Sequence, residues 1–229
     1  MDRGTEVFEG LNVLHVDEAL IVLDKPAGLL SAPGRGAEKQ DCLVARARDC
    51  WPDALLVHRL DQATSGLMLL ARGPDMQRAL SMCFAAREVH KRYEAVVDGW
   101  VTGAPDHQDD GEIALPLMAD WPRRPRQKVD AQGKPSLTRW KVLARESMGQ
   151  QGSGAANHTT RLALFPVTGR SHQLRVHLHA IGHPILGDAL YADEAIQARS
   201  PRLLLHACEL SLFHPRTAAL TIWRSCVPF

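Results

Sequence analysis

The stretch from Leu55 to Ala71 constrains the fold more than any other part of the sequence. It holds two aliphatic runs, Leu55–Val57 and Leu67–Ala71, with a polar segment between them. Short aliphatic runs bounded by turn residues are typical of buried strands, so we predict two strands with Asp61 at the bend. A carboxylate held at such a bend is a candidate reactive group. Aspartate is also common in turns for local reasons, because its side chain bonds nearby backbone N–H groups.

The same pattern of aliphatic runs and turn residues recurs along the chain. Further strands are predicted over residues 13–16, 20–23, 90–99, 139–143, 160–167, 202–212 and 218–223. Helices are predicted over residues 42–48, capped by Asp41, and over residues 75–87, with Pro74 at the start. Because hairpins and loops join most of the strands, we predict an α+β fold with a mixed, largely antiparallel sheet and flanking helices. Alternation within residues 90–99 places Tyr93, Ala95 and Val97 on one face.

The chain of 229 residues is long enough for one buried core or for two closely joined lobes. No apolar run approaches the ~20 residues that a membrane-spanning helix needs, and the N-terminus has no signal-type stretch. The five cysteines are scattered, which favours reduced thiols over disulfides. We therefore expect a cytoplasmic protein, with a flexible tip over residues 148–154.

The net charge is only +1, but basic residues gather in one part of the sequence. Between Trp121 and Arg145 there are eight lysines and arginines, and Asp130 is the single acidic residue. This segment overlaps residues 102–136, which are rich in Pro, Gly and charge and are predicted to form a long functional loop. A local basic face can bind a polyanion, although it is equally typical of a solvated surface.

Residues 168–184 form a second charged group and are predicted to be a loop, a helix and a stop. Ser171 is the expected cap, and Gly182 and Pro184 are expected to end the helix. One face of the helix would carry apolar residues toward the sheet, and these residues are Leu174, Leu178 and Ile181. Another face would carry basic residues toward an anion, and these residues are His172, Arg175 and His179. A metal site is disfavoured because no Glu or Cys completes a zinc ligand set beside His177 and His179.

Three motifs, taken together, resemble the RluA family of pseudouridine synthases. They are His58–Gly66 (HRLDQATSG), Lys91–Tyr93 (KRY) and Gly169–His177 (GRSHQLRVH). The resemblance extends to residues 25–29, 183–188 and 203–207 and covers most of the chain. Residues 121–129 are similar to the bacterial dual-specificity member, which modifies the tRNA anticodon stem-loop and a hairpin of 23S ribosomal RNA. The resemblance implies the pseudouridine synthase fold, with a central active-site cleft in one catalytic domain (residues 1–229) and no separate N-terminal S4-like domain.

The resemblance also implies a reaction, in which uracil leaves C1′, rotates and rejoins the sugar through C5. Asp61 matches the family's essential aspartate, Tyr93 its active-site tyrosine, and Arg175 the basic residue expected to keep the aspartate ionised. Asp61 could attack C6 of the base or C1′ of the sugar, or remove a sugar proton, and the sequence does not choose between these roles. The isomerisation needs no redox equivalent, so we expect neither cofactor nor metal.

The resemblance implies that RNA is the partner. We expect the protein to be a monomer and not to associate with membranes. The target base must be flipped out of its stem, and Arg59 is the candidate to fill the vacated space or to hold the displaced phosphate. The other candidate RNA contacts are Lys91, Arg92, Arg123, Arg124, Arg126, Lys128, Arg170 and His172.

Three other functions remain open on the sequence. A synthase of this type could act on only one class of RNA, and a non-catalytic RNA-binding protein would not require the set of Asp61, Tyr93 and Arg175. A glycosidase would need a second carboxylate ~5–10 Å from Asp61. Beside the motifs the only such group is Glu94, which alternation turns away from Tyr93.

Overall fold

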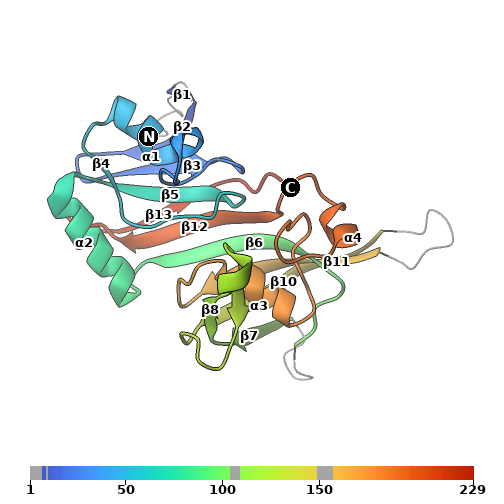
Figure 1. Cartoon of the computed structure of the whole chain (residues 1–229). Helices are drawn as coiled ribbons and strands as arrows, with labels where there is room; N and C mark the ends of the chain where they lie inside the picture. The colour runs from blue at the N-terminus through green and yellow to red at the C-terminus, as the bar shows by residue number, and fades with distance from the viewer. Residues whose placement is uncertain (1–6, 9, 104–108, 149–156) are drawn as a thin grey trace. The chain divides into compact units, whose positions relative to one another are not determined.

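The computed structural model describes residues 7–8, 10–103, 109–148 and 157–229 (Figure 1). The chain divides into two compact units, which are described separately here. The first unit comprises Met1–Lys91 and His206–Pro228, and the second comprises Arg92–Leu205 and Phe229. Within each unit strands dominate and helices are few, which confirms the predicted α+β class. In the described ranges no helix has the length and apolar character needed to cross a membrane.

The first unit is built on a sheet with β5 near its middle. Its strands run in the order β1 (Val7–Phe8), β2 (Leu11–Val16), β3 (Leu20–Lys25), β5 (Ser65–Arg72) and β12 (Leu205–Phe213). Two short strands, β4 (Ala54–Leu56) and β13 (Leu220–Arg224), pair with β5 and β12. The β5–β12 pair is parallel and the other pairs in this unit are antiparallel. Because β5 is flanked on both sides, its aliphatic run is buried from Leu67 to Ala71, as predicted.

Two helices, α1 (Leu43–Cys50) and α2 (Gly73–Ala86), pack against the strands of the first unit, which also holds the short η1 (Ala37–Lys39). α2 carries Pro74 in its first turn, as predicted. The predicted cap of α1 is wrong, because Cys42 is the N-cap residue. The Asp41 carboxylate instead accepts hydrogen bonds from Nε and Nη2 of Arg46, both at 2.7 Å. A bidentate charged partner outcompetes backbone N–H groups for this side chain.

The second unit has an antiparallel sheet ordered β6 (His90–Asp98), β11 (Asn157–Pro166), β10 (Leu137–Met148) and β7 (Asp110–Ala114). The first two residues of β6, His90 and Lys91, belong to the first unit. A separate two-stranded sheet pairs β8 (Leu117–Ala119) with β9 (Gln127–Val129), and η2 (Trp121–Arg123) lies between them. Helix α3 (Gln173–Ala180) packs against β9, β10 and β11, and α4 (Glu194–Gln197) follows it in the chain.

The prediction that residues 102–136 form one long loop is wrong. β7 pairs with β10, and β8 pairs with β9. The backbone N–H and C=O of Leu117 also bond those of Lys134, at 3.0 and 2.8 Å. Ile113 and Leu117 are buried, so these isolated apolar residues anchor strands in an otherwise polar segment. Residues 104–108 of this segment, and all but Met148 of the predicted tip, lie outside the described residues.

The predicted start of α3 is also wrong, while its predicted end is confirmed. His172, rather than Ser171, is the N-cap residue, and it has a left-handed φ of 54°. At the other end Gly182 has a φ of 85°, which favours glycine. Its N–H bonds the carbonyl of His179 at 3.0 Å, and the N–H of His183 bonds that of Leu178 at 2.9 Å. These two bonds satisfy carbonyls that the end of a helix leaves exposed.

Candidate active site

Asp61 lies in the first unit, on the turn that leads from β4 into β5. The turn is closed by a hydrogen bond of 3.1 Å from the N–H of Thr64 to the carbonyl of Asp61. Asp61 is half-buried and Arg59 is exposed. The predicted position of this carboxylate, just before a buried strand, is therefore confirmed.

A buried lysine holds the Asp61 turn against the loop that follows β3. Lys25 has no exposed surface, and its Nζ donates to the carbonyls of Pro26 (2.8 Å), Leu29 (2.8 Å) and Gln62 (3.1 Å). A buried ammonium is costly without such partners, so three carbonyl oxygens fix the two loops around one point. Ser31 adds a second tie, because its Oγ donates to the carbonyl of Leu60 at 2.7 Å. The backbone on both sides of Asp61 is thus anchored.

The start of β5 is held equally closely on its other side, against β12. Gly66 has a φ of 112°, and a Cβ at this position would lie 2.3 Å from the carbonyl oxygen of Ala207. Only glycine allows this approach of two backbones. Beside it, Oγ of Ser65 lies 2.8 Å from Nδ1 of His206, whose Nε2 lies 2.9 Å from Oγ of Ser225. The Ser225 hydroxyl in turn donates to Asp24 on β3.

His58, three residues before Asp61, is held neutral. Its Nε2 accepts a hydrogen bond of 2.9 Å from the N–H of Leu69, and its ring stacks on Phe84 with centroids 4.6 Å apart. Burial, with a smaller contribution from the charge of Lys91, lowers the pKa of His58 from 6.5 to about 3. A nitrogen that accepts a hydrogen bond from a backbone N–H cannot also carry a proton. The hydrogen bond from Leu69 and the lowered pKa therefore both indicate a neutral His58 ring.

The stability of the protein is therefore expected to fall as the pH decreases below 6.5. Between pH 6.5 and about 3 the unfolded chain protonates His58 and the folded chain does not. This difference lowers the free energy of unfolding by at most about 1.4 kcal/mol per pH unit. Urea unfolding at several pH values would measure the slope. His58→Gln, whose amide oxygen can accept from Leu69, should remove this part of it, and His90→Gln, at an exposed histidine, should not. Equal slopes in all three proteins would contradict the prediction.

Tyr93 lies in the second unit, on β6 opposite Leu164 of β11. It is half-buried, and Ala95 and Val97 at the same alternation are buried, which confirms the predicted face. Glu94 points to the other face, where it accepts from Nη2 of Arg92 at 2.6 Å and lies 3.6 Å from Arg161. Of the motif residues beside Tyr93, Lys91 is half-buried, and burial lowers its pKa.

Arg175 of the predicted basic face is buried inside the second unit, and the anion that it meets is a carboxylate of the same unit. Its Nε and Nη2 donate to the two carboxylate oxygens of Asp188 at 2.8 and 2.6 Å. The same carboxylate accepts the backbone N–H groups of Leu190 and Tyr191. Arg175 and Asp188 are only 4% and 1% exposed. Of the predicted apolar face, Leu174 and Leu178 are buried but Ile181 is exposed.

Two further polar residues fix α3 from inside. Gln173 is buried, and its Nε2 donates to the carbonyl of Leu137 and to Oγ1 of Thr138, both at 3.0 Å. His177 has no exposed surface and lies 3.0 Å from Oγ1 of Thr138 through Nδ1 and 3.0 Å from the carbonyl of Leu115 through Nε2. Burial lowers the pKa of His177, although its bond to Leu115 acts in the opposite direction. Neutral His177 is therefore a structural residue of this helix.

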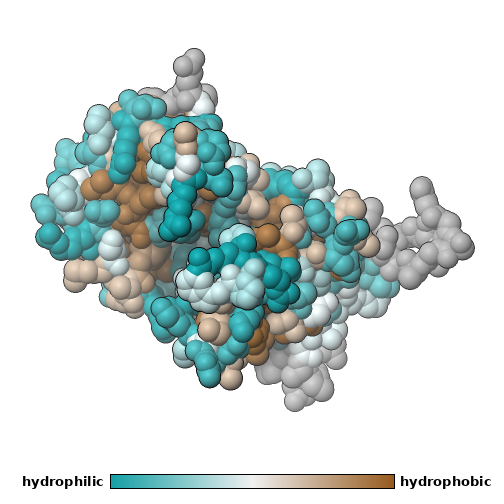
Figure 2. Space-filling model, in the orientation of Figure 1, coloured by the Kyte–Doolittle hydropathy of each residue, from teal (hydrophilic) through white to brown (hydrophobic). Residues whose placement is uncertain are grey.

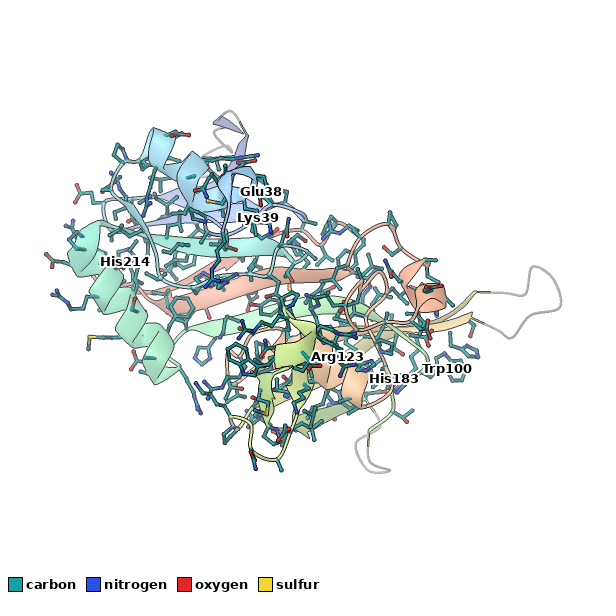
Figure 3. The ribbon with its side chains drawn as sticks, viewed as in Figure 1. Glu38, Lys39, Trp100, Arg123, His183 and His214 are labelled. Carbon is teal, nitrogen blue, oxygen red and sulfur yellow. The ribbon has the colours of Figure 1, made fainter. Side chains whose placement is uncertain are left out.

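We call the β8–η2–β9 segment the basic hairpin, and its Arg123, Arg124 and Lys128 are exposed. Figure 2 shows hydrophilic residues in teal over much of the face on which this segment is drawn in Figure 1. Arg123, labelled in Figure 3, donates to Asp120 at 2.7 Å, and Lys128 donates to Asp130 at 2.7 Å. The guanidinium of Arg124 lies 3.2 Å from the ring centroid of the exposed Trp121. Arg126 is half-buried beside the ring of Tyr191, 5.4 Å away. Arg170 is exposed and His172 half-buried just before α3.

The structure thus distributes the predicted site residues over both units. Arg59, Asp61 and Lys91 belong to the first unit, and Tyr93, Arg175 and the remaining basic candidates belong to the second. The meeting of Asp61 with Arg175 and Tyr93 stays a prediction. The sequence analysis missed four buried partners, Lys25, Asp188, Tyr191 and His206. Lys25, Asp188 and His206 lie in stretches of family resemblance, which was the available signal, and Tyr191 follows one of these stretches by three residues.

The comparisons with known proteins cover the part of the chain that contains these motifs. The family model described as RNA pseudouridylate synthase matches residues 19–180, which is more than half of the chain. The chain belongs to the RNA pseudouridylate synthase family. The match begins one residue before β3, includes the Asp61 turn and β6, and ends at the last residue of α3.

Among the described residues, no group of three His, Cys, Asp or Glu side chains is arranged to hold a metal ion.

Several curated members of this pseudouridylate synthase family are similar over most of their length. The "Dual-specificity RNA pseudouridine synthase RluA" of Vibrio cholerae is 47% identical over 208 residues, covering 90% of this chain and 79% of the relative. The protein of the same name from Escherichia coli K12 is 45% identical over 206 residues, covering 90% and 88%. Among solved structures, human RNA Pseudouridylate Synthase Domain Containing 1 gives a TM-score of 0.76 at 26% identity, covering 100% and 87%. The predicted family and fold are confirmed.

Proposed function

We propose that this protein is a dual-specificity RNA pseudouridine synthase, which isomerises uridine in the tRNA anticodon stem-loop and in a hairpin of 23S ribosomal RNA. Asp61 is the reactive carboxylate. The observation that carries the proposal is the anchored Asp61 turn, within a chain 45–47% identical to relatives named "Dual-specificity RNA pseudouridine synthase RluA". We also propose that the protein acts as a cytoplasmic monomer in one catalytic domain and needs no cofactor.

The rigid turn is what this chemistry requires of the first unit. A nucleophile or base must meet a carbon of the flipped nucleotide at a fixed distance, and small misplacements cost large factors in rate. Lys25 and Ser31 hold one side of the turn, and the close contact at Gly66 holds the other. In the proposed mechanism Tyr93 stacks on the uracil ring and takes part in proton movement. The guanidinium of Arg175 keeps Asp61 ionised.

The release of tritium from RNA labelled at C5 of uridine tests this activity directly, because forming the new carbon–carbon bond displaces that hydrogen. We expect release with both an anticodon stem-loop and a 23S hairpin. Release from only one of them would restrict the enzyme to one class of RNA. Binding of RNA without release would support the alternative of a non-catalytic RNA-binding protein and would refute the proposed isomerisation. Mapping pseudouridine in a deletion strain would identify the positions.

Arg59 is proposed to support base flipping, because it is exposed two residues from Asp61. Flipping costs a few kcal/mol in a folded stem and little in an unstructured strand. Arg59→Ala is therefore expected to lower kcat/KM on folded hairpins about tenfold or more, and to have little effect on a short unstructured oligomer containing uridine. Arg35→Ala, at another exposed arginine of the first unit, is the matched control. Equal losses on the two substrates would exclude this role.

The basic hairpin is proposed to bind phosphates of the RNA. The guanidinium groups of Arg124 and Arg126 lie against aromatic rings, whereas that of Arg123 bonds the Asp120 carboxylate. An aromatic ring does not neutralise a positive charge as a carboxylate does, so Arg124 and Arg126 are better placed than Arg123 to bind an external anion. RNA binding should weaken steeply with salt, and Arg124→Ala should reduce the log–log slope by about one. Filter binding at several salt concentrations would measure this. Arg224→Ala, which removes an exposed arginine on β13, should leave the slope unchanged. A flat salt dependence of the wild type would contradict phosphate contacts.

A further inference from the structure

Tyr191 connects three parts of the second unit that are separate along the chain. Its hydroxyl accepts a hydrogen bond of 2.8 Å from the N–H of Gln127, the first residue of β9. The same hydroxyl lies 2.7 Å from Nδ1 of His172, the N-cap residue of α3. Its backbone N–H donates to Asp188, and its ring centroid lies 5.1 Å from the guanidinium of Arg175. One side chain therefore contacts the basic hairpin, the start of α3 and the buried ion pair.

One hydrogen bond of Tyr191 has a defined direction, because the hydroxyl accepts from the backbone N–H of Gln127, which can only donate. The hydroxyl and Nδ1 of His172 form a second hydrogen bond, whose direction follows the tautomer of the His172 ring. Because Tyr191 is only 5% exposed, water cannot readily replace a lost partner.

The basic hairpin needs such a support because it is a small sheet of its own. Within the described residues β8 and β9 pair only with each other, apart from the backbone bonds between Leu117 and Lys134. A two-stranded sheet is marginally stable by itself. Its apolar support is the cluster of Leu117, Val176 and Tyr191, and its polar support at β9 is the Tyr191 hydroxyl.

We propose that Tyr191 is a positioning residue that fixes the basic hairpin relative to α3 and Arg175, and so determines how well folded RNA is used. This proposal rests on the proposed function. In this proposal the basic hairpin binds structured RNA outside the target nucleotide, and Tyr191 fixes the position of the hairpin. In this proposal Tyr191 acts through the hairpin and not on the reacting atoms. Its effect therefore falls on recognition of a folded substrate and leaves the chemical step unchanged.

Tyr191→Phe is the decisive variant, because it removes the hydroxyl and keeps the ring in the apolar cluster. Steady-state kinetics by tritium release should show KM for a folded stem-loop raised about tenfold, as expected for one buried hydrogen-bond partner lost. We expect kcat to stay unchanged, and kcat/KM on a short unstructured oligomer to stay within about twofold of the wild type. A structural role alone would not separate KM from kcat, nor one substrate from the other.

The matched control is Thr160→Val on β11 of the same unit. Thr160 also has a buried hydroxyl that accepts from a backbone N–H, that of Val101 at 3.0 Å, and donates to the carbonyl of Gly99 at 2.7 Å. Its loss should cost comparable stability in urea and leave KM unchanged. An equal rise of KM in both variants would overturn the proposal, and so would an unchanged KM in Tyr191→Phe.

A double-mutant cycle separates coupling through the hairpin from a general loss of stability. If Tyr191 acts through the hairpin, the effects of Tyr191→Phe and Arg124→Ala on KM should not add, because both variants weaken the same contact between the hairpin and the RNA. Additive effects would overturn this route. Inactivity of the wild type on every RNA would instead refute the proposed function, so the two failures are distinguishable.

Discussion

Replacing Asp61 by asparagine is expected to abolish pseudouridine formation on every RNA while leaving the fold intact. Asparagine has the same shape and is as common in turns, and the bonds that hold this turn come from the backbone of Asp61 and Gln62 and from Lys25. An amide can neither attack a carbon as a carboxylate does nor act as a base. We expect kcat to fall by at least about 10³-fold, as for other reactive side chains.

Tritium release from labelled stem-loops measures this loss, and urea unfolding shows whether the fold is kept. Asp53→Asn is the matched control, since Asp53 also lies on a turn of the first unit and pairs with Arg72 at the surface. It should retain full activity. Residual activity of Asp61→Asn within tenfold of the wild type, on any RNA, would remove Asp61 from the chemical step.

The elements that the sequence predicted correctly are those that local patterns determine. Aliphatic runs between turn residues located β3 and β5, because a strand buried on both faces needs an apolar residue at nearly every position. The same signal located β2 and β13, although these two strands are only partly buried. Alternation located the buried face of β6, and Pro74 and Gly182 marked the start of one helix and the end of another. The position of Asp61 followed from these local signals.

The errors arose where a distant or competing partner decides. Asp41 does not cap α1 because Arg46 binds its carboxylate. Within residues 102–136, β7 depends on its pairing with β10, and β8 depends on β9 and on the bonds of Leu117 to Lys134. The site shows the same division. Motifs pointed to Asp61, Tyr93 and Arg175, and helical spacing placed Arg175 on a basic face without identifying the anion that it meets inside the unit. Its burial depends on Asp188, 13 residues further along, and no periodicity reports such a partner.

Replacing Asp188 by alanine is expected to lower the free energy of unfolding by about 3–5 kcal/mol, because it removes the carboxylate partner of a buried guanidinium. Both side chains are at least 96% buried from solvent, and the carboxylate also bonds two backbone N–H groups. Urea unfolding measures the change. Glu112→Ala removes an exposed partner of Arg139 in the same unit and should cost less than about 1 kcal/mol. Similar losses in the two variants would contradict the buried pair's importance.

The same pair allows the two roles of Arg175 to be separated. A buried ion pair replaced by apolar side chains of similar volume often keeps or gains stability, so Arg175→Met with Asp188→Leu should recover much of what Asp188→Ala loses. If Arg175 also keeps Asp61 ionised, this stable double variant should lose activity, and more so at lower pH, since a carboxylate without a cationic neighbour protonates more readily. Full activity across the pH range would make Arg175 a structural residue only. A stable and inactive protein would show that the guanidinium acts in the reaction as well as in the fold.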